Sequence, residues 1–143
     1  MGVSQIFLDS NLFVYLFEDA GPRGQRAEYI IRQLVLRQAS VLTSTLTFGE
    51  VLVKPVETGN RILEQKYRTL LDAPTVTVLP FDRKASEIFA VIRQNRAIKA
   101  PDAIQLSSAA SAGCDLFITN DERLSRTIVP GIQFIVSMDR APL

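Results

Sequence analysis

Short apolar runs alternate with longer amphipathic segments along the chain. The runs are rich in Ile, Val, Leu and Phe and are bounded by polar or turn-forming residues, as is typical of buried strands. They cover residues 6–8, 40–44, 75–79, 115–118 and 132–136. We predict one strand in each run.

The segments between the runs have the spacing of helices that bury one face. In the segment after Asp82, for example, Ala85, Ile88, Phe89 and Ile92 fall on one side of a helix that Asp82 would cap. Helices are expected at residues 12–17, after the turn at 21–22, from 45 to Pro55, from about 58 to 71, after Asp82, from Pro101 to about 112 and briefly after 123.

Alternation of nearly continuous apolar strands with helices is typical of a parallel sheet covered on both faces. The predicted fold class is therefore α/β, a three-layer α/β/α arrangement with a central parallel sheet of about five strands. No internal repeat, low-complexity tract or linker divides the chain, so we expect a single domain over residues 1–143.

The composition restricts the chemistry. The chain has no histidine and one cysteine, which excludes disulfides, Cys/His zinc sites and an imidazole base. Cys114, at a helix-to-strand junction, is expected to be a small buried hydrophobe. The formal net charge of +1 does not indicate a dedicated duplex-DNA binder. Arg26, Arg32 and Arg37 share the outer face of one predicted helix, which is either simply solvated or a nucleic-acid contact.

No apolar run approaches the length that spans a bilayer, and the chain does not open with a signal-peptide pattern. We therefore expect a cytoplasmic protein.

Three aspartates are predicted to meet at one edge of the sheet. Asp9 follows the first strand directly, and Asp121 follows the fourth. Asp102 opens a helix that leads into a strand, and such a helix runs antiparallel to its strand, so its start returns to the same edge. Ligands bind at this edge in open α/β sheets. Each aspartate also has a purely structural explanation, as a helix cap or as a favourable charge in a first turn.

Glu50 is the fourth carboxylate at this edge. It lies about a turn and a half into the helix that leaves the second strand, so its side chain can reach back. Its helix neighbours Leu46 and Val53 are apolar, and Lys54 is one turn away. We therefore expect a partly buried carboxylate with no basic partner, for which a cation is the simplest partner.

Carboxylates that converge without histidine or cysteine form an oxygen-only site, which suits Mg²⁺ or Mn²⁺ better than zinc. Such a cluster can hold one or two cations that activate a water and stabilise charge on a phosphate. Phosphodiester hydrolysis is the reaction this chemistry serves most naturally.

The order of the motifs resembles the PIN-domain nucleases, particularly the VapC-like toxins of toxin-antitoxin pairs. The resemblance rests on Leu8-Asp9-Ser10-Asn11, Phe48-Gly49-Glu50-Val51, Pro101-Asp102-Ala103-Ile104 and Thr119-Asn120-Asp121-Glu122-Arg123-Leu124. It covers the whole chain and implies a PIN-like fold of Rossmann-like topology, with the activity of a metal-dependent endoribonuclease. It also implies a homodimer and an antitoxin whose peptide covers the acidic groove.

The resemblance also implies roles for individual residues. Asp9 and Asp102 would be the principal metal ligands, and Glu50 and Asp121 would bind the metal directly or through water. Asn11 and Asn120 would support the ligands or contact the substrate. Arg123 stands where many relatives carry another Asp, which leaves the second metal position open; it would contact phosphate or simply be solvated.

Two other functions fit the residues less well. Asp9-Ser10-Asn11 faintly resembles the Asp-x-Asp opening of haloacid-dehalogenase-type phosphatases, but Asn11 replaces the second acid. A PIN-like interaction module without activity is the other alternative, against which the presence of all four acids argues.

Overall fold

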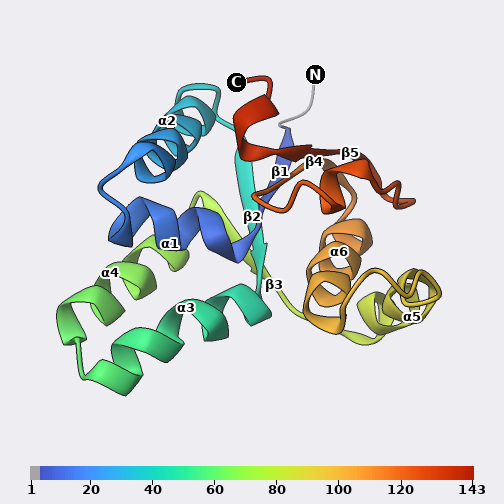
Figure 1. Ribbon diagram of the computed structural model, residues 1–143, viewed down its shortest axis with the longest axis horizontal. Helices are drawn as coiled ribbons and strands as arrows, with labels where there is room; N and C mark the ends of the chain where they lie inside the picture. Colours follow the sequence, from blue (N-terminus) through green and yellow to red (C-terminus); the bar gives the residue numbers. More distant parts are fainter. Residues whose placement is uncertain (1–3) are drawn as a thin grey trace.

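The computed structural model describes residues 4–143, and its centre is a five-stranded, all-parallel sheet in the order β3-β2-β1-β4-β5 (Figure 1). The strands are β1 (Gln5–Leu8), β2 (Ser40–Ser44), β3 (Val76–Leu79), β4 (Cys114–Thr119) and β5 (Ile132–Ser137). Each predicted strand is present, with ends that differ by one residue at most. The parallel α/β/α fold predicted from the apolar runs is confirmed.

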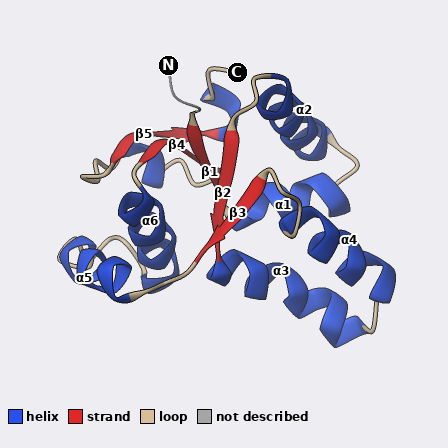
Figure 2. Cartoon of the chain, turned by 180° about the vertical axis from the view of Figure 1, so that it is seen from behind, coloured by secondary structure: helices blue, strands red, loops and turns tan. Residues whose placement is uncertain are grey.

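Six α-helices and two short 3₁₀ helices connect the strands in the described residues. They are α1 (Ser10–Glu18), α2 (Pro22–Leu36), α3 (Thr45–Thr58), α4 (Arg61–Leu71), α5 (Arg83–Ile92), α6 (Ala100–Ala112), η1 (Leu124–Arg126) and η2 (Met138–Arg140). Helices α1 to α4 lie on one side of the sheet and α5 and α6 on the other (Figures 1 and 2).

Alternate residues of the central strands feed the two cores. Ile6 and Leu8 of β1 pack under α1 to α4, whereas Phe7 packs on the side of α5 and α6. Phe7 lies directly opposite Phe117 of β4, and their rings stack with centroids 4.8 Å apart. Because both faces of the central strand β1 are covered, its three consecutive residues Ile6, Phe7 and Leu8 are all apolar and buried.

The C-terminal edge of the sheet is where the chain leaves β1, β2 and β4. Ser44 ends β2 and caps α3 by accepting a hydrogen bond from the Thr47 amide. Asp82 caps α5 through the Ala85 amide, as predicted, and Pro101 lies in the first turn of α6. These junctions fix where the side chains at this edge begin.

Two predicted helix boundaries were wrong. Pro55 does not end α3, which continues to Thr58 with Pro55 buried inside it. The loss of one backbone hydrogen bond is tolerated there, and the helix ends instead at Gly59, whose φ of 68° is left-handed. The next helix begins at Arg61, after the Asn60 cap, and not at Thr58.

The arginines of α2 are not a uniform solvated face. Arg26 donates to the carbonyls of Met138 and Ala141, at 2.9 and 3.2 Å, and Arg37 donates to the carbonyl of Pro142 at 3.4 Å. Arg32 pairs with Glu28 on the same helix. Arg26 in α2 and Arg37, the residue that caps its C-terminal end, therefore hold the C-terminal segment against this helix.

Cys114 is buried, as expected, and burial raises the pKa of its thiol to about 11. Across residues 4–143, none of the helices combines the length and the apolar character needed to cross a membrane.

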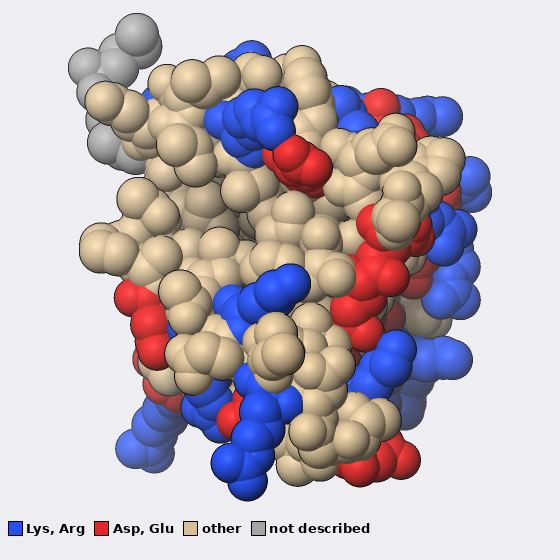
Figure 3. Space-filling view, turned by 90° about the vertical axis from the view of Figure 1, so that its left-hand side faces the viewer, with Lys and Arg blue, Asp and Glu red and all other residues tan. Residues whose placement is uncertain are grey.

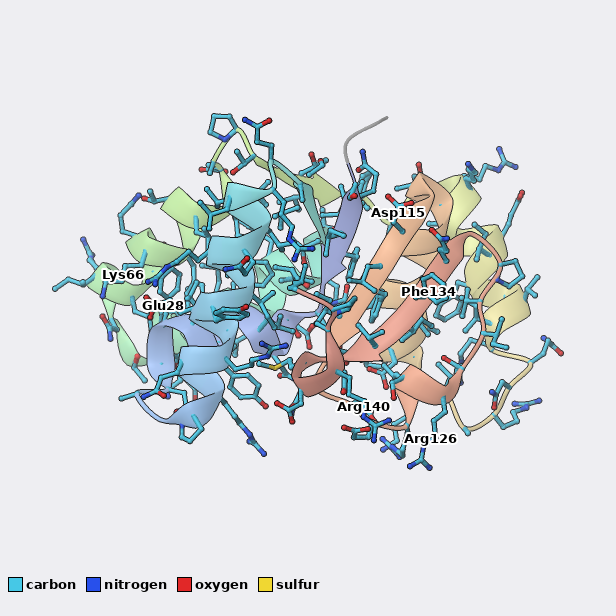
Figure 4. The ribbon with its side chains drawn as sticks, turned by 90° about the horizontal axis from the view of Figure 1, so that it is seen from above. Glu28, Lys66, Asp115, Arg126, Phe134 and Arg140 are labelled. Atoms are coloured by element: carbon cyan, nitrogen blue, oxygen red, sulfur yellow. The ribbon has the colours of Figure 1, made fainter. Side chains whose placement is uncertain are left out.

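The stacked pair at the centre of the sheet gives a stability prediction. Phe117→Ala removes a fully buried ring and should lower the free energy of unfolding by about 3–5 kcal/mol. Phe134→Ala on the edge strand β5 (Figure 4) is the matched control, since that ring is 61% exposed, and should cost less than about 1 kcal/mol. Urea denaturation measures both. Similar losses in the two variants would contradict the placement of the core.

Candidate active site

Asp9 lies at the centre of the candidate site, in the turn between β1 and α1. It is 6% exposed, and both of its carboxylate oxygens accept hydrogen bonds. Oδ1 accepts from the Ser10 amide at 2.8 Å and from Gln105 Nε2 at 3.3 Å, and Oδ2 accepts from the Thr119 hydroxyl at 2.8 Å. Burial raises the pKa of the Asp9 carboxyl, although these hydrogen bonds partly oppose the shift.

Gln105, which sequence reasoning missed, ties Asp9 to the interior. It is buried on α6, and its Nε2 also donates to the Thr47 hydroxyl at 2.7 Å. Its Oε1 accepts a hydrogen bond from the Ser44 hydroxyl. The network fixes the side-chain amide and hence one of the donors to Asp9.

Two signals in the sequence could have revealed this network. Ser44 and Thr119 are polar and are the last residues of β2 and β4. Asp9 directly follows the last residue of β1, so all three lie at the C-terminal edge of the sheet. Gln105 is three residues after Asp102 on a helix made mostly of small residues, so it lies one turn further along nearly the same face.

Asp102 lies in the first turn of α6 and is partly buried. Burial raises the pKa of its carboxyl most strongly, and the charges of Asp9 and Asp121 raise it further. Arg123 and Lys99 oppose the shift. Because the charge of Asp9 acts on the Asp102 carboxyl, the two side chains lie near one another.

Glu50 reaches the same group from α3. Desolvation raises the pKa of its carboxyl, the charge of Asp9 adds to that rise, and the Ser10 hydroxyl opposes it by a hydrogen bond. The residue as a whole is nevertheless exposed. The carboxyl end of the side chain, on which Ser10 and Asp9 act, is the part that is desolvated.

The apolar surroundings predicted for Glu50 are wrong. Val53 is 61% exposed, so it does not cover the side chain of Glu50. Lys54 turns away and pairs with Glu18, with Nζ 3.1 Å from Oε1. Glu18 in turn accepts a hydrogen bond from the buried Tyr67 hydroxyl, which ties α1, α3 and α4 together. Packing between helices therefore decides where Lys54 points.

Asp121 differs from the other three acids because it has a basic partner. Arg123 Nε and Nη2 contact its Oδ1 and Oδ2 at 3.3 and 3.1 Å, and the Arg123 amide donates to Oδ1 at 2.9 Å. These contacts lower the pKa of the Asp121 carboxyl. The Asp121 amide donates to the Thr119 hydroxyl at 3.1 Å, which links this turn to Asp9.

The two asparagines lie apart from the acids. Asn11 is exposed on α1. Asn120 donates to the Tyr15 hydroxyl at 2.8 Å and so anchors the turn after β4 to α1. The contact of Asn120 is structural, and within residues 4–143 neither asparagine side chain forms a hydrogen bond with the four carboxylates.

The structure thus brings Asp9, Glu50 and Asp102 into electrostatic contact and pairs Asp121 with Arg123. Within residues 4–143, the carboxylates do not form a cluster of three or more that could directly enclose a metal ion. The donor chemistry still fits Mg²⁺, which usually takes one or two carboxylates and keeps several waters. Burial is the main cause of the raised pKa values of these three acids, and none of them forms an ion pair within residues 4–143.

The family model described as PIN domain matches residues 6–129. This match covers most of the chain, and the protein belongs to the PIN domain family. Comparison with curated protein sequences finds no match.

Solved structures share the fold. One is the structure of VapBC2 from Rickettsia felis bound to a DNA fragment from their promoter, with a TM-score of 0.73, 14% identity, and coverage of 93% of this chain and 98% of that one. A toxin-antitoxin complex from Klebsiella pneumoniae has a TM-score of 0.67 and 24% identity, with coverage of 92% of this chain and 99% of that one. DNA-bound VapBC from Salmonella typhimurium has a TM-score of 0.66 and 20% identity, with coverage of 95% of this chain and 99% of that one. At these identities the likeness shows the fold alone.

The opposite pKa shifts of Asp102 and Asp121 predict opposite effects on stability without metal. A carboxyl whose folded pKa is raised supports the fold below its unfolded pKa and loses that support as pH rises through the folded value. Asp102→Asn should therefore leave the metal-free protein at pH 7 equally stable or up to about 1 kcal/mol more stable, since solvent screens the repulsion. The difference should vanish below about pH 4.

Asp121→Asn is the matched control, because its folded pKa is lowered and its ion pair supports the fold above the unfolded pKa. It should lower the stability at pH 7 by at most about 1 kcal/mol. Thermal or urea unfolding in chelator measures both variants. A large loss of stability in Asp102→Asn would mean that Asp102 serves α6 as a first-turn charge.

Proposed function

We propose that the protein is a metal-dependent endoribonuclease that hydrolyses RNA phosphodiester bonds. The observation that carries this proposal is that Asp9 acts electrostatically on both Glu50 and Asp102, while none of the three forms an ion pair with a basic residue among residues 4–143. Membership of the PIN domain family supports a nuclease, and the oxygen-only ligands favour Mg²⁺ or Mn²⁺.

The chain's own residues would hold and orient the reacting groups. Asp9 and Asp102 would hold the ion, with Asp9 kept in place by Thr119 and Gln105. When bound, the divalent ion supplies an activated water and stabilises charge on the phosphate. Glu50, which solvent reaches, would accept a proton from the attacking water at its carboxylate.

The biological role that fits best is the toxin of a toxin-antitoxin pair. Each of the three solved structures above is described as a toxin-antitoxin complex or as VapBC. An antitoxin protein, a homodimer and a cytoplasmic location belong to the same proposal.

We place part of the antitoxin on an apolar groove between α1 and α4. Its volume is about 750 Å³, and it is lined by Phe17, Arg61, Ile62, Gln65, Lys66, Thr69 and Leu70. Figure 3 shows this side of the molecule, where groups of Lys and Arg and groups of Asp and Glu surround uncharged side chains. Phe17 lies eight residues after Asp9 on α1, roughly 12 Å along the helix axis. An extended peptide of a few residues could therefore fill the groove and reach the acids.

RNA digestion by the purified protein tests the activity. Wild type with Mg²⁺ or Mn²⁺ should cut RNA and should lose the activity in chelator, whereas Asp9→Asn and Asp102→Asn should cut at least about 100-fold more slowly. Asp115→Asn is the matched control, since this exposed carboxylate lies near the start of β4, at the opposite edge of the sheet (Figure 4). Its rate should equal that of wild type.

Two results would contradict the proposal. Cutting that persists in Asp9→Asn or in chelator would show that the site is not responsible. Intact RNA together with hydrolysis of a small phosphate ester would favour the phosphatase, and inactivity on both would favour an interaction module.

The groove gives a separate prediction for the partner. Ile62→Asp places a charge on a groove side chain that is 75% exposed, and should weaken the complex with the product of a neighbouring small open reading frame by at least about 10-fold. Val91→Asp on α5, 69% exposed, is the control on the opposite side of the sheet and should bind as wild type does. Calorimetry with the purified partner measures both. Equal binding by the two variants would place the partner elsewhere.

A further inference from the structure

Arg123 is the one basic side chain that directly contacts any of the four carboxylates among residues 4–143. Its guanidinium contacts both carboxylate oxygens of Asp121, Oδ1 through Nε and Oδ2 through Nη2. The backbone amide of Arg123 donates a third hydrogen bond, to Oδ1. All three contacts lie within a single turn of three residues. The pairing therefore forms locally and does not depend on the packing of distant elements.

Arg123 also faces Asp102. Asp102, Asp121 and Arg123 line one small cavity of about 80 Å³, together with Asn95, Ala97, Ile98, Leu124 and Thr127. The charge of Arg123 opposes the rise in the pKa of Asp102. Arg123 thus lines the same cavity as both acids, and its positive charge acts on each of them.

A guanidinium is a permanent cation, because it is not deprotonated in proteins. An ion that used Asp121 would have to displace Arg123 and would meet its positive charge at close range. Among residues 4–143, no basic side chain pairs with Asp9 or Glu50, and their hydrogen-bond partners are Ser10, Gln105 and Thr119.

We infer that Arg123 acts as a built-in cation that occupies Asp121, so that the RNA-free protein binds a single divalent ion, held by Asp9 and Asp102 with Glu50. This inference rests on the proposed function. Asp121 is then not a metal ligand in the RNA-free protein, and one ion binds per chain.

The guanidinium also has a task left when RNA binds. Nε and Nη2 are engaged by Asp121, whereas Nη1 has no hydrogen-bond partner in the part of the chain that the structure describes. The side chain is mostly exposed, so Nη1 can donate to a phosphate oxygen next to the ion. Arg123 would then supply at the phosphate the positive charge that a second ion would otherwise supply.

Titration of the RNA-free protein with Mn²⁺ tests the inference, because it counts ions without any cleavage. Wild type should bind one ion per chain at pH 7. Arg123→Met, which frees Asp121, should bind two ions. The dissociation constant of its second ion should be at least about 10-fold lower than that of any further, weak binding to wild type. Adding Asp121→Asn to Arg123→Met should return the count to one. Thermal unfolding checks that each variant is folded.

Arg126→Met is the matched control. It removes an exposed arginine from η1, three residues further on, and should keep one ion. Two ions in wild type, one ion in Arg123→Met, or a second ion that survives Asp121→Asn would each overturn the inference.

The ion count separates this inference from the proposed function. One ion in wild type without any cutting of RNA would overturn the function and leave the inference standing. Two ions with metal-dependent cutting would do the reverse. No ion in wild type would overturn both.

Discussion

The buried charge of Asp9 is the constraint on which the rest of the site depends. Its carboxylate lies at the end of β1, where its oxygens are satisfied by neutral groups, an amide of the backbone, the side-chain amide of Gln105 and the hydroxyl of Thr119. Hydrogen bonds of this kind fix the carboxylate but leave its charge in place. The charge of Asp9 then raises the pKa of the Glu50 and Asp102 carboxyls.

The parallel sheet explains why acids from distant parts of the chain meet there. Each strand of a parallel sheet ends at the same edge, and each returning helix begins near it. Asp9 and Thr119 follow or end two neighbouring strands, and Asp102 opens the helix that crosses back. Asp9 therefore meets Asp102, about ninety residues away, through the topology alone, and the hydroxyls and amide beside them hold the geometry.

Asp121 and Arg123 show how a local contact modifies such a site. The other three acids owe their surroundings to tertiary structure, whereas this pair lies within one turn. The four carboxylates therefore differ, because Asp121 is paired with Arg123 and the other three have no ion pair among residues 4–143.

The sequence by itself determined the strands, the parallel α/β/α class and the edge at which the acids gather. Apolar runs of three to five residues and the cap at Asp82 act over short distances, so the sequence contains them directly. Only the tertiary structure decided the rest. It buried Pro55 inside α3, left Glu50 exposed, sent Lys54 to Glu18 and placed Gln105 against Asp9. Each of these depends on which surfaces of separate helices meet, and the spacing of residues along one helix does not contain that information.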